Sequence, residues 1–228
     1  LDFRLWTLDF GLWTLDFRRM MSVSKLALLG GKPIRTRPFT RWPIFGKAEE
    51  KRLLRALRSG KWGRLSGPEV AEFENRFAAM HGCKHGIGVV NGTVSLRIAL
   101  VAARIRAEDE VIIPPYTFFS TASAVIEANA VPVFADVDLH TFNLDPAAVE
   151  AAITPRTKAI IPVHFAGQPA DMQAIMAIAR KHKLFVIEDA AHAHGASYQN
   201  RPAGSLGHIA SFSFQSSKNL TAGEGGIL

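Results

Sequence analysis

The sequence predicts an α/β protein with a mostly parallel sheet that carries helices on both faces. Short runs rich in valine and isoleucine recur along the chain, as at residues 110–113 and 158–163. Between them lie longer segments with apolar residues at helical spacing, such as residues 171–182. Continuous apolar strands that alternate with helices are typical of parallel sheets buried on both sides.

The first predicted elements are two helices. Residues 47–57 carry an amphipathic pattern that stops at Ser59-Gly60, and glycine is common just past the end of a helix. Pro68 stands at the start of a second helical pattern over residues 69–80. Proline fits the first turn of a helix because the backbone donor that it lacks has no intrahelical partner there.

Strands and helices then alternate along the chain. The expected elements, in order, are strand 85–90, helix 93–106, strand 110–113, helix 119–128, strand 131–135, helix 146–153, strand 158–163, helix 171–182, strand 184–188 and strand 210–214. Gly226-Ile227 is expected to open one more strand. In such a sheet, binding and catalytic groups gather at the carboxyl ends of the strands.

The first twenty residues contain a near-exact repeat of seven. Leu1-Asp-Phe-Arg-Leu-Trp-Thr is followed by Leu8-Asp-Phe-Gly-Leu-Trp-Thr, and the repeat then decays. A coiled coil would need more repeats, and the aspartates interrupt the continuous apolar stretch that a secretory signal requires. We interpret the segment as translated upstream sequence, with the true start at Met20 or Met21.

Composition sets broad limits on the class of protein. The chain has 228 residues, of which 48% are hydrophobic and 21% charged, enough to bury a core. No apolar run approaches the roughly 20 residues that span a bilayer. Cys83 is the single cysteine, which excludes an internal disulfide and a multi-cysteine metal cage and favours the reducing cytoplasm.

The formal charge of +7 is concentrated near the N-terminus. Between Lys32 and Arg64 there are eleven Lys and Arg residues against two acids, Glu49 and Glu50. One interpretation is a nucleic-acid patch. The favoured interpretation is a solvated helix face with basic loops, because the stretch lacks the interleaved aromatic residues that stack on bases.

Lys218 and Asp189 are the most informative residues. Lys218 lies among small polar residues and glycines, in the segment 213–226, and Asp189 closes the apolar run 184–189. This pair fits pyridoxal 5'-phosphate (PLP), whose aldehyde forms a Schiff base with a lysine amine and whose pyridinium nitrogen is kept protonated by a carboxylate. Taken alone, the alternative is a solvated surface lysine.

A phosphate site is predicted at Asn91-Gly92-Thr93, which follows one strand and opens a helix. Backbone N–H groups at a helix N-terminus bind phosphate, and a glycine permits close approach. The hydroxyl of Ser213, at the end of another predicted strand, is placed to complete this cradle. The alternative for the Gly-Thr pair is an ordinary helix cap.

Two further motifs follow predicted strands. Phe118 could stack on a heteroaromatic ring, or be an ordinary core aromatic. His192 and His194 follow Asp189, and their spacing on an extended segment would put both imidazoles on one face. A metal site is therefore an alternative, although no further cluster of histidine or cysteine completes its ligands.

Together, the motifs at 91–93, 115–118, 188–195 and 213–226 resemble the DegT/StrS-type (DegT/DnrJ/StrS) PLP-dependent sugar aminotransferases, a likeness that covers residues 26–228. The resemblance implies PLP-dependent transferase fold type I, similar to aspartate aminotransferase. The sequence Gln215-Ser-Ser-Lys is closest to members that act on cyclitols or form 3-amino-5-hydroxybenzoate.

The resemblance also implies residue roles. Lys218 would be the Schiff-base lysine and the acid–base group, Asp189 the partner of the pyridinium nitrogen, and His192 a contact near the phenolic oxygen. Phe118 would stack on the ring. The implied cofactor-binding set is Gly92, Thr93, Phe118, Asp189, His192, Ser213 and Lys218.

The implied activity is transfer of an amino group from glutamate or glutamine to a keto-sugar or keto-cyclitol, in amino sugar, polysaccharide or antibiotic biosynthesis. A cytoplasmic homodimer is expected, with no nucleic-acid or membrane partner. Alternatives are a PLP-dependent dehydratase or lyase, a non-catalytic PLP-binding regulatory relative, and an inactive fragment or broken reading frame. In the family's dehydratases a histidine replaces the lysine, so Lys218 favours amino transfer.

Three segments are therefore expected along the chain. Residues 1–20 would be a non-native or disordered leader, and residues 21–60 an N-terminal arm and helix. Residues 61–228 would form the PLP-binding large domain. That domain is expected to be incomplete, because members of the family are longer and continue into a small C-terminal domain.

Overall fold

The computed structural model describes residues 25–228, so the repeat and the expected start at Met20 or Met21 lie outside the described residues. The chain divides into two compact units, residues 1–42 and 43–228. The described part of the first unit contains the 3-10 turn η1 (Ala27–Leu29). The expected boundaries at residues 20 and 60 stay predictions.

The second unit begins with two helices, α2 (Lys47–Ser59) and α3 (Glu69–Met80). Helix α2 ends where the sequence predicts, because Gly60 adopts the left-handed conformation (φ 63°) that glycine tolerates. The guanidinium of Arg55 joins the two helices through a hydrogen bond of 2.8 Å from Nη2 to Oε2 of Glu69. Both side chains are partly exposed, so this pair contributes little to stability.

A seven-stranded sheet follows, with strand order β1-β9-β8-β5-β4-β2-β3. Its strands are β1 (Gly88–Val89), β2 (Glu110–Ile113), β3 (Val131–Phe134), β4 (Thr157–Ile160), β5 (Phe185–Asp189), β8 (Ile209–Ser213) and β9 (Gly226–Ile227). All pairs from β3 to β8 are parallel, while β9 runs antiparallel to both β8 and β1. Every strand except β9 therefore runs in one direction, and their carboxyl ends share one edge.

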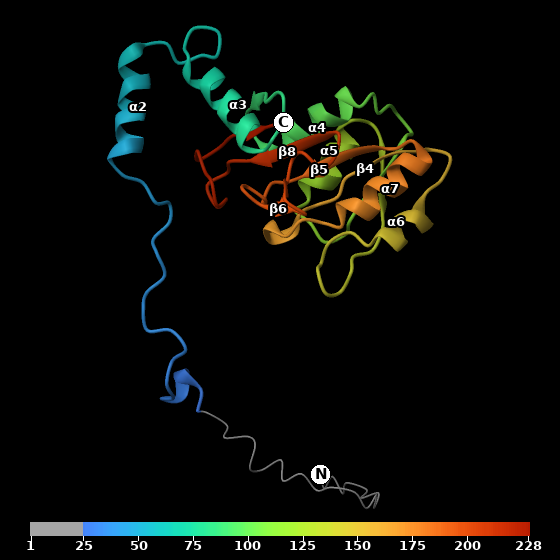
Figure 1. Cartoon of the computed structure of the whole chain (residues 1–228), viewed down its shortest axis with the longest axis horizontal. Helices are drawn as coiled ribbons and strands as arrows, with labels where there is room; N and C mark the ends of the chain where they lie inside the picture. The colour runs from blue at the N-terminus through green and yellow to red at the C-terminus, as the bar shows by residue number, and fades with distance from the viewer. Residues whose placement is uncertain (1–24) are drawn as a thin grey trace, which may run out of the picture. The chain divides into compact units, whose positions relative to one another are not determined.

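Helices cover both faces of this sheet (Figure 1). Helices α4 (Gly92–Ala102) and α5 (Ser120–Glu127) pack on one face, and α6 (Pro146–Ala152) and α7 (Met172–His182) on the other. Neighbouring residues of β2 alternate between the two cores because successive strand side chains point to opposite faces: Val111 and Ile113 join the first cluster, and Ile112 the second.

The prediction of a mostly parallel α/β sheet is confirmed, and some details differ: α4 ends at Ala102 instead of residue 106, and β4 ends at Ile160 instead of residue 163. The strand expected over 85–90 covers only Gly88–Val89, which pair with the two residues of β9, and Ile87 beside them exchanges backbone hydrogen bonds with Leu228. A small hairpin, β6 (Ser197–Tyr198) with β7 (Arg201–Pro202), was not predicted. Its two turn residues both have positive φ, which suits a tight hairpin, but they are Gln-Asn rather than the usual Asn-Gly.

The buried carboxylate of Glu188 ties β5 to the loop after β7. Its Oε1 accepts hydrogen bonds from the backbone N–H groups of Leu206 (2.7 Å) and Gly207 (2.6 Å). Its Oε2 accepts from the N–H of Gly204 (2.7 Å) and lies 2.9 Å from Nε2 of His164. Burial alone would raise the pKa of Glu188, but His164 and these amide donors outweigh it and lower the pKa.

His164 is held in one tautomer by its surroundings. Its Nδ1 accepts a hydrogen bond of 3.2 Å from the backbone N–H of Ala170. The ring proton therefore sits on Nε2, which donates it to Glu188. His164 and Glu188 are both fully buried, so this pairing connects the segment after β4 with β5 inside the core.

In residues 25–228, no helix combines the length and the apolar character that crossing a bilayer requires.

We expect Glu188→Gln to lower the free energy of unfolding by about 2–4 kcal/mol, because the new amide NH₂ would face groups that are themselves donors. Urea denaturation near neutral pH measures this. The control is Glu127→Gln on the exposed side of α5, expected to change stability by less than about 0.5 kcal/mol.

The same contribution depends on pH. Because the folded-state pKa of Glu188 is lowered, its stabilisation is present above the ordinary glutamate pKa of about 4.3 and is lost as pH falls through the folded-state value. Equal losses in Glu188→Gln and Glu127→Gln would contradict the structural role.

Candidate active site

A cavity of about 650 Å³ lies at the carboxyl edge of the sheet. Its walls come from the loops that follow β1, β2, β4, β5 and β8. The structure places the whole implied cofactor-binding set in this one cavity: Gly92, Thr93, Phe118, Asp189, His192, Ser213 and Lys218.

One corner of the cavity is the N-terminus of α4. Asn91 caps the helix, since its Oδ1 accepts a hydrogen bond of 2.9 Å from the N–H of Val94. The N–H groups of Gly92 and Thr93 keep no acceptor among residues 25–228. Ser213 closes the corner, because a side-chain carbon at position 92 would lie 2.9 Å from its Cβ. Free N–H groups and hydroxyls at a helix N-terminus fit an anionic group such as phosphate.

The same corner is held by close contacts with β8 and β9. Ser211 Oγ donates a hydrogen bond of 3.2 Å to the carbonyl of Gly92, and Thr93 Oγ1 lies 2.7 Å from Ser120 Oγ. A side-chain carbon at Gly226 would lie 2.5 Å from the carbonyl oxygen of Asn91. Glycine at position 226 is therefore required for the strand to approach the helix so closely.

Asp189 ends β5 with its side chain almost completely buried. Its Oδ2 accepts a hydrogen bond of 2.8 Å from Thr121 Oγ1, and its Oδ1 accepts one of 3.3 Å from the N–H of Ala191. Thr121 in turn lies 2.8 Å from the hydroxyl of Thr117. Thr121 was not among the residues predicted from the sequence, where its position four residues after Thr117 is its only signal.

Lys218 reaches the cavity from the loop after β8. Its backbone N–H donates a hydrogen bond of 2.9 Å to the carbonyl of Gln215. Burial disfavours the ammonium form and lowers the pKa of Lys218, while attraction to Asp189 opposes that shift. A lowered pKa leaves more of the amine neutral at a given pH, which is the form that attacks a carbonyl.

His192 and His194 do not share a face, so the expectation based on an extended segment is wrong. Residues 190–195 form consecutive turns. His192 lines the cavity, with its ring 6.3 Å from that of Phe165. His194 lies elsewhere, and its Nδ1 is 2.8 Å from Oδ1 of Asn219. Across the described chain, no three His, Cys, Asp or Glu side chains converge as a metal site would need.

The surroundings of His192 favour its neutral form. Burial lowers the pKa of His192, and the nearby Lys218 lowers it further, while Asp189 acts in the opposite direction. A neutral imidazole can both donate and accept a hydrogen bond.

Aromatic side chains form one wall of the cavity. Phe118 is 63% exposed, so it is not a core residue, and its ring centroid lies 4.4 Å from that of Phe119. Tyr116 also lines the cavity and packs on Phe165 at 4.5 Å. These rings give the polar cavity an apolar side that suits a flat ligand.

This fold and this cavity define an α/β enzyme domain. The sequence also identifies the family to which the domain belongs. Residues 43–228 match the DegT/DnrJ/EryC1/StrS aminotransferase family. The chain belongs to this family.

Two relatives illustrate its place there. The chain is 50% identical over 190 residues to 3-amino-5-hydroxybenzoate synthase of Amycolatopsis mediterranei, covering 83% of this chain and 49% of the relative. It is 47% identical over 207 residues to L-glutamine:2-deoxy-scyllo-inosose aminotransferase of Streptoalloteichus tenebrarius, covering 88% and 49%. The chain therefore spans about half the length of these relatives.

Solved structures with similar folds come from the same kind of enzyme. A crystal structure of 3-amino-5-hydroxybenzoic acid synthase matches with a TM-score of 0.82 and 48% identity, covering 85% of this chain and 50% of that one. Spr1654 of Streptococcus pneumoniae, described as a sugar aminotransferase, matches at 31% identity over 85% of this chain and 52% of its own. Its PLP form gives a TM-score of 0.78 and its PMP form 0.79.

We expect Lys218 to react with an amine-directed acylating reagent at lower pH than an ordinary lysine, whose pKa is about 10.4. Burial makes the neutral amine available earlier as pH rises. Peptide mass spectrometry after brief labelling across a pH series gives the midpoint. A midpoint at or above the ordinary value would contradict the partly buried environment.

The effect of Asp189 on this midpoint has a defined sign. Since Asp189 favours the ammonium form, Asp189→Asn is expected to move the midpoint of Lys218 to still lower pH.

Proposed function

We propose that this chain carries the cofactor and catalytic residues of a PLP-dependent aminotransferase that moves an amino group from glutamine or glutamate to a keto-cyclitol or keto-sugar. The observation that carries the proposal is the meeting of Lys218 and Asp189 in one cavity with the anion-binding corner at Gly92 and Ser213. Residues far apart in sequence thereby supply the groups that PLP requires.

The hydrogen-bond donors that line the cavity fit the groups of PLP. The free N–H groups of Gly92 and Thr93, with the hydroxyl of Ser213, would hold the phosphate. The exposed ring of Phe118 would cover one face of the pyridine, and His192 would lie beside its polar substituents. When bound, PLP supplies an electron sink that stabilises negative charge at the α-carbon of an amino acid.

Asp189 and Thr121 would act at the ring nitrogen. Asp189 holds a proton there by charge attraction, and the Thr121 hydroxyl orients the carboxylate through its hydrogen bond to Oδ2. The near-complete burial of Asp189 keeps water from competing for that proton.

Lys218 would have two tasks. Its amine attaches the cofactor, and its lowered pKa favours the neutral form that this requires. As a free amine, Lys218 Nζ would also be placed to take a proton from the α-carbon of an amino-acid substrate and to give it back, acting as base and then acid.

The relatives guide the choice of substrates. One is named for glutamine as donor and an inosose as acceptor, and the other for 3-amino-5-hydroxybenzoate. Both names contain a cyclic compound, so we propose a cyclic ketone as the acceptor for this chain. The single cysteine, Cys83, is consistent with a cytoplasmic enzyme.

We expect the purified chain to bind PLP with a visible absorbance band that Lys218→Ala abolishes, because the band depends on the covalent link to the amine. Glutamine or glutamate should then convert the bound cofactor to its amine form in the wild-type chain. Lys158→Ala, far from the cavity, is the matched control and should behave as wild type.

The outcomes separate the alternatives. Conversion by an amino donor supports amino transfer. A stable visible band that no donor converts would instead favour the dehydratase, lyase or regulatory alternatives. Absence of any band in the wild-type chain would contradict cofactor binding altogether.

We also propose that the protein is a homodimer with the cavity near its interface. The loop after β2 presents Tyr116, Phe118 and Phe119 beside the cavity, and these side chains are 50%, 63% and 68% exposed. A cluster of exposed aromatic residues at a site is typical of an association surface.

Light scattering during gel filtration tests this. The chain of 24.9 kDa should elute with twice that mass, and Phe119→Asp should shift it toward the monomer because an unpaired charge would be buried. Val101→Asp is the control, since Val101 is equally exposed (61%) but lies at the end of α4 away from this loop. A monomeric wild type, or equal effects of both variants, would contradict the proposal.

A further inference from the structure

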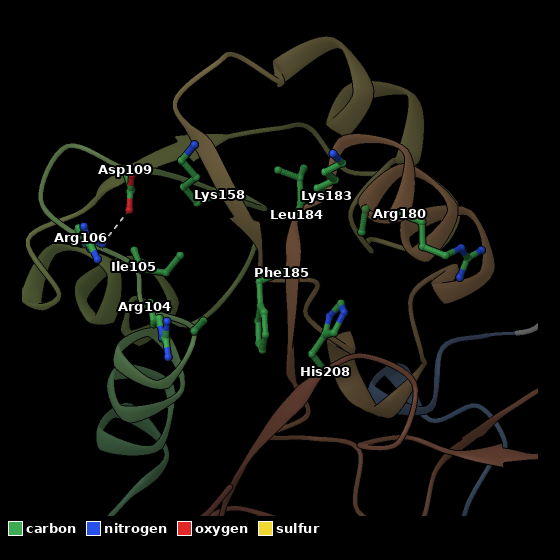
Figure 2. A pocket seen from close by; sticks show the side chains of 12 residues that line it. Arg104, Ile105, Arg106, Asp109, Lys158, Arg180, Lys183, Leu184, Phe185 and His208 are labelled. Carbon is green, nitrogen blue, oxygen red and sulfur yellow. Dashed lines mark hydrogen bonds between the residues drawn. The ribbon is translucent and has the colours of Figure 1, made fainter.

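A second cavity, of about 640 Å³, lies at the opposite edge of the sheet (Figure 2). Its walls come from the amino ends of β2, β4 and β5 and from the segments that follow α4 and α7. It shares no lining residue with the cavity that contains Lys218. A ligand here would therefore bind independently of the proposed amino transfer.

The second cavity is strongly cationic. Its exposed basic residues are Arg104, Arg106, Lys158, Arg180 and Lys183. Within residues 25–228 none of these five forms an ion pair. Asp109 is the single acid among the lining residues, and its Oδ2 already accepts a hydrogen bond of 2.7 Å from the backbone N–H of Arg106. No acidic side chain of residues 25–228 therefore pairs with these five cations, although Lys158 Nζ lies 3.4 Å from the carbonyl oxygen of Pro155.

Helix dipoles explain only part of the cluster. Cations stabilise helix C-termini, and this accounts for Arg104 after α4 and for Arg180 and Lys183 at the end of α7. It does not account for Lys158, which lies within β4, or for Arg106, beyond the helix. In Figure 2, Arg106 lies on the same side of the cavity as Arg104, and Lys158 adds a cation from β4 between that side and Lys183.

Two of the cations also occupy unusual backbone positions. Arg104 and Lys183 both adopt left-handed conformations, with φ of 60° and 58°. Glycine or asparagine is the usual residue where a helix ends in this way. The chain instead carries a long basic side chain at both positions that border the cavity.

The cavity has an aromatic floor. Phe185 lies in its middle (Figure 2) and stacks on His208 with ring centroids 4.6 Å apart. Nδ1 of His208 accepts a hydrogen bond of 3.0 Å from the N–H of Val186, so a neutral His208 carries its proton on Nε2. The floor therefore offers an apolar ring surface with a hydrogen-bond donor beside it.

We propose that this cavity binds a small molecule that carries a diphosphate or longer polyphosphate group. Several cations from separate elements match a ligand with at least three negative charges, and arginine favours phosphate oxygens because its donors form a planar fork. The volume lies within the range of small-molecule sites, about 300–1,000 Å³. A flat group attached to the phosphates would rest on Phe185.

Isothermal titration of the chain with inorganic pyrophosphate and with ADP tests the proposal, at about 50 mM salt and again at about 300 mM. The cavity variant is Arg104→Gln/Lys158→Gln/Lys183→Gln. The matched control, Lys47→Gln/Lys51→Gln/Arg58→Gln, removes the same charge from exposed positions of α2. Circular dichroism verifies that both variants fold.

We expect saturable binding of one ligand per chain, weakened about tenfold or more in the cavity variant and less than about twofold in the control. Should the triple variant not fold, Lys158→Gln alone is expected to weaken binding about threefold. Tighter binding of ADP than of pyrophosphate would identify a nucleotide-like ligand that uses Phe185. Equal affinities would identify the phosphate groups alone as the recognised part.

Three results would overturn the proposal. One is no saturable binding of either probe. Another is equal weakening in the cavity variant and the α2 control, because that indicates diffuse surface charge. The third is cavity-dependent binding of a poly-glutamate peptide without binding of pyrophosphate, which would identify an acidic protein partner.

Discussion

The position of the candidate active site depends on the buried carboxylate of Glu188. It accepts hydrogen bonds from three backbone amides of the segment 204–207 and from His164. Successive residues of a strand point to opposite faces, so anchoring Glu188 on one side of β5 fixes Asp189 on the other. Glu188 thus anchors the segment 204–207 to β5, and the adjacent Asp189 faces the cavity.

The fold and much of the site could be predicted because both follow from short-range patterns. Apolar runs such as 110–113 identify buried strands without knowledge of their neighbours. Parallel strands then bring their carboxyl ends to one edge, so motifs that follow separate strands must converge. The positions of Gly92, Asp189 and Lys218 after separate strands therefore predict that the three residues meet, and the cavity contains all three.

The remaining details depend on tertiary contacts that a single sequence does not reveal. Thr121 looks like an ordinary helix residue, and only the packing of α5 against β5 brings its hydroxyl to Asp189. The separation of His192 from His194 depends on turns in residues 190–195, whereas their spacing implies a shared face only on an extended backbone. The partner of His194, Asn219, is 25 positions away.

The two cavities lie at opposite ends of the same strands. Between them, Ile160, Val186 and Ile187 of β4 and β5 are completely buried, and closely packed strands have little room to shift. Coupling of the two ends through displacement of the strands would require such a shift. The buried strands thus separate the two cavities. The free-energy changes caused by substitutions at the two ends should therefore be additive, and such substitutions could be selected separately during evolution.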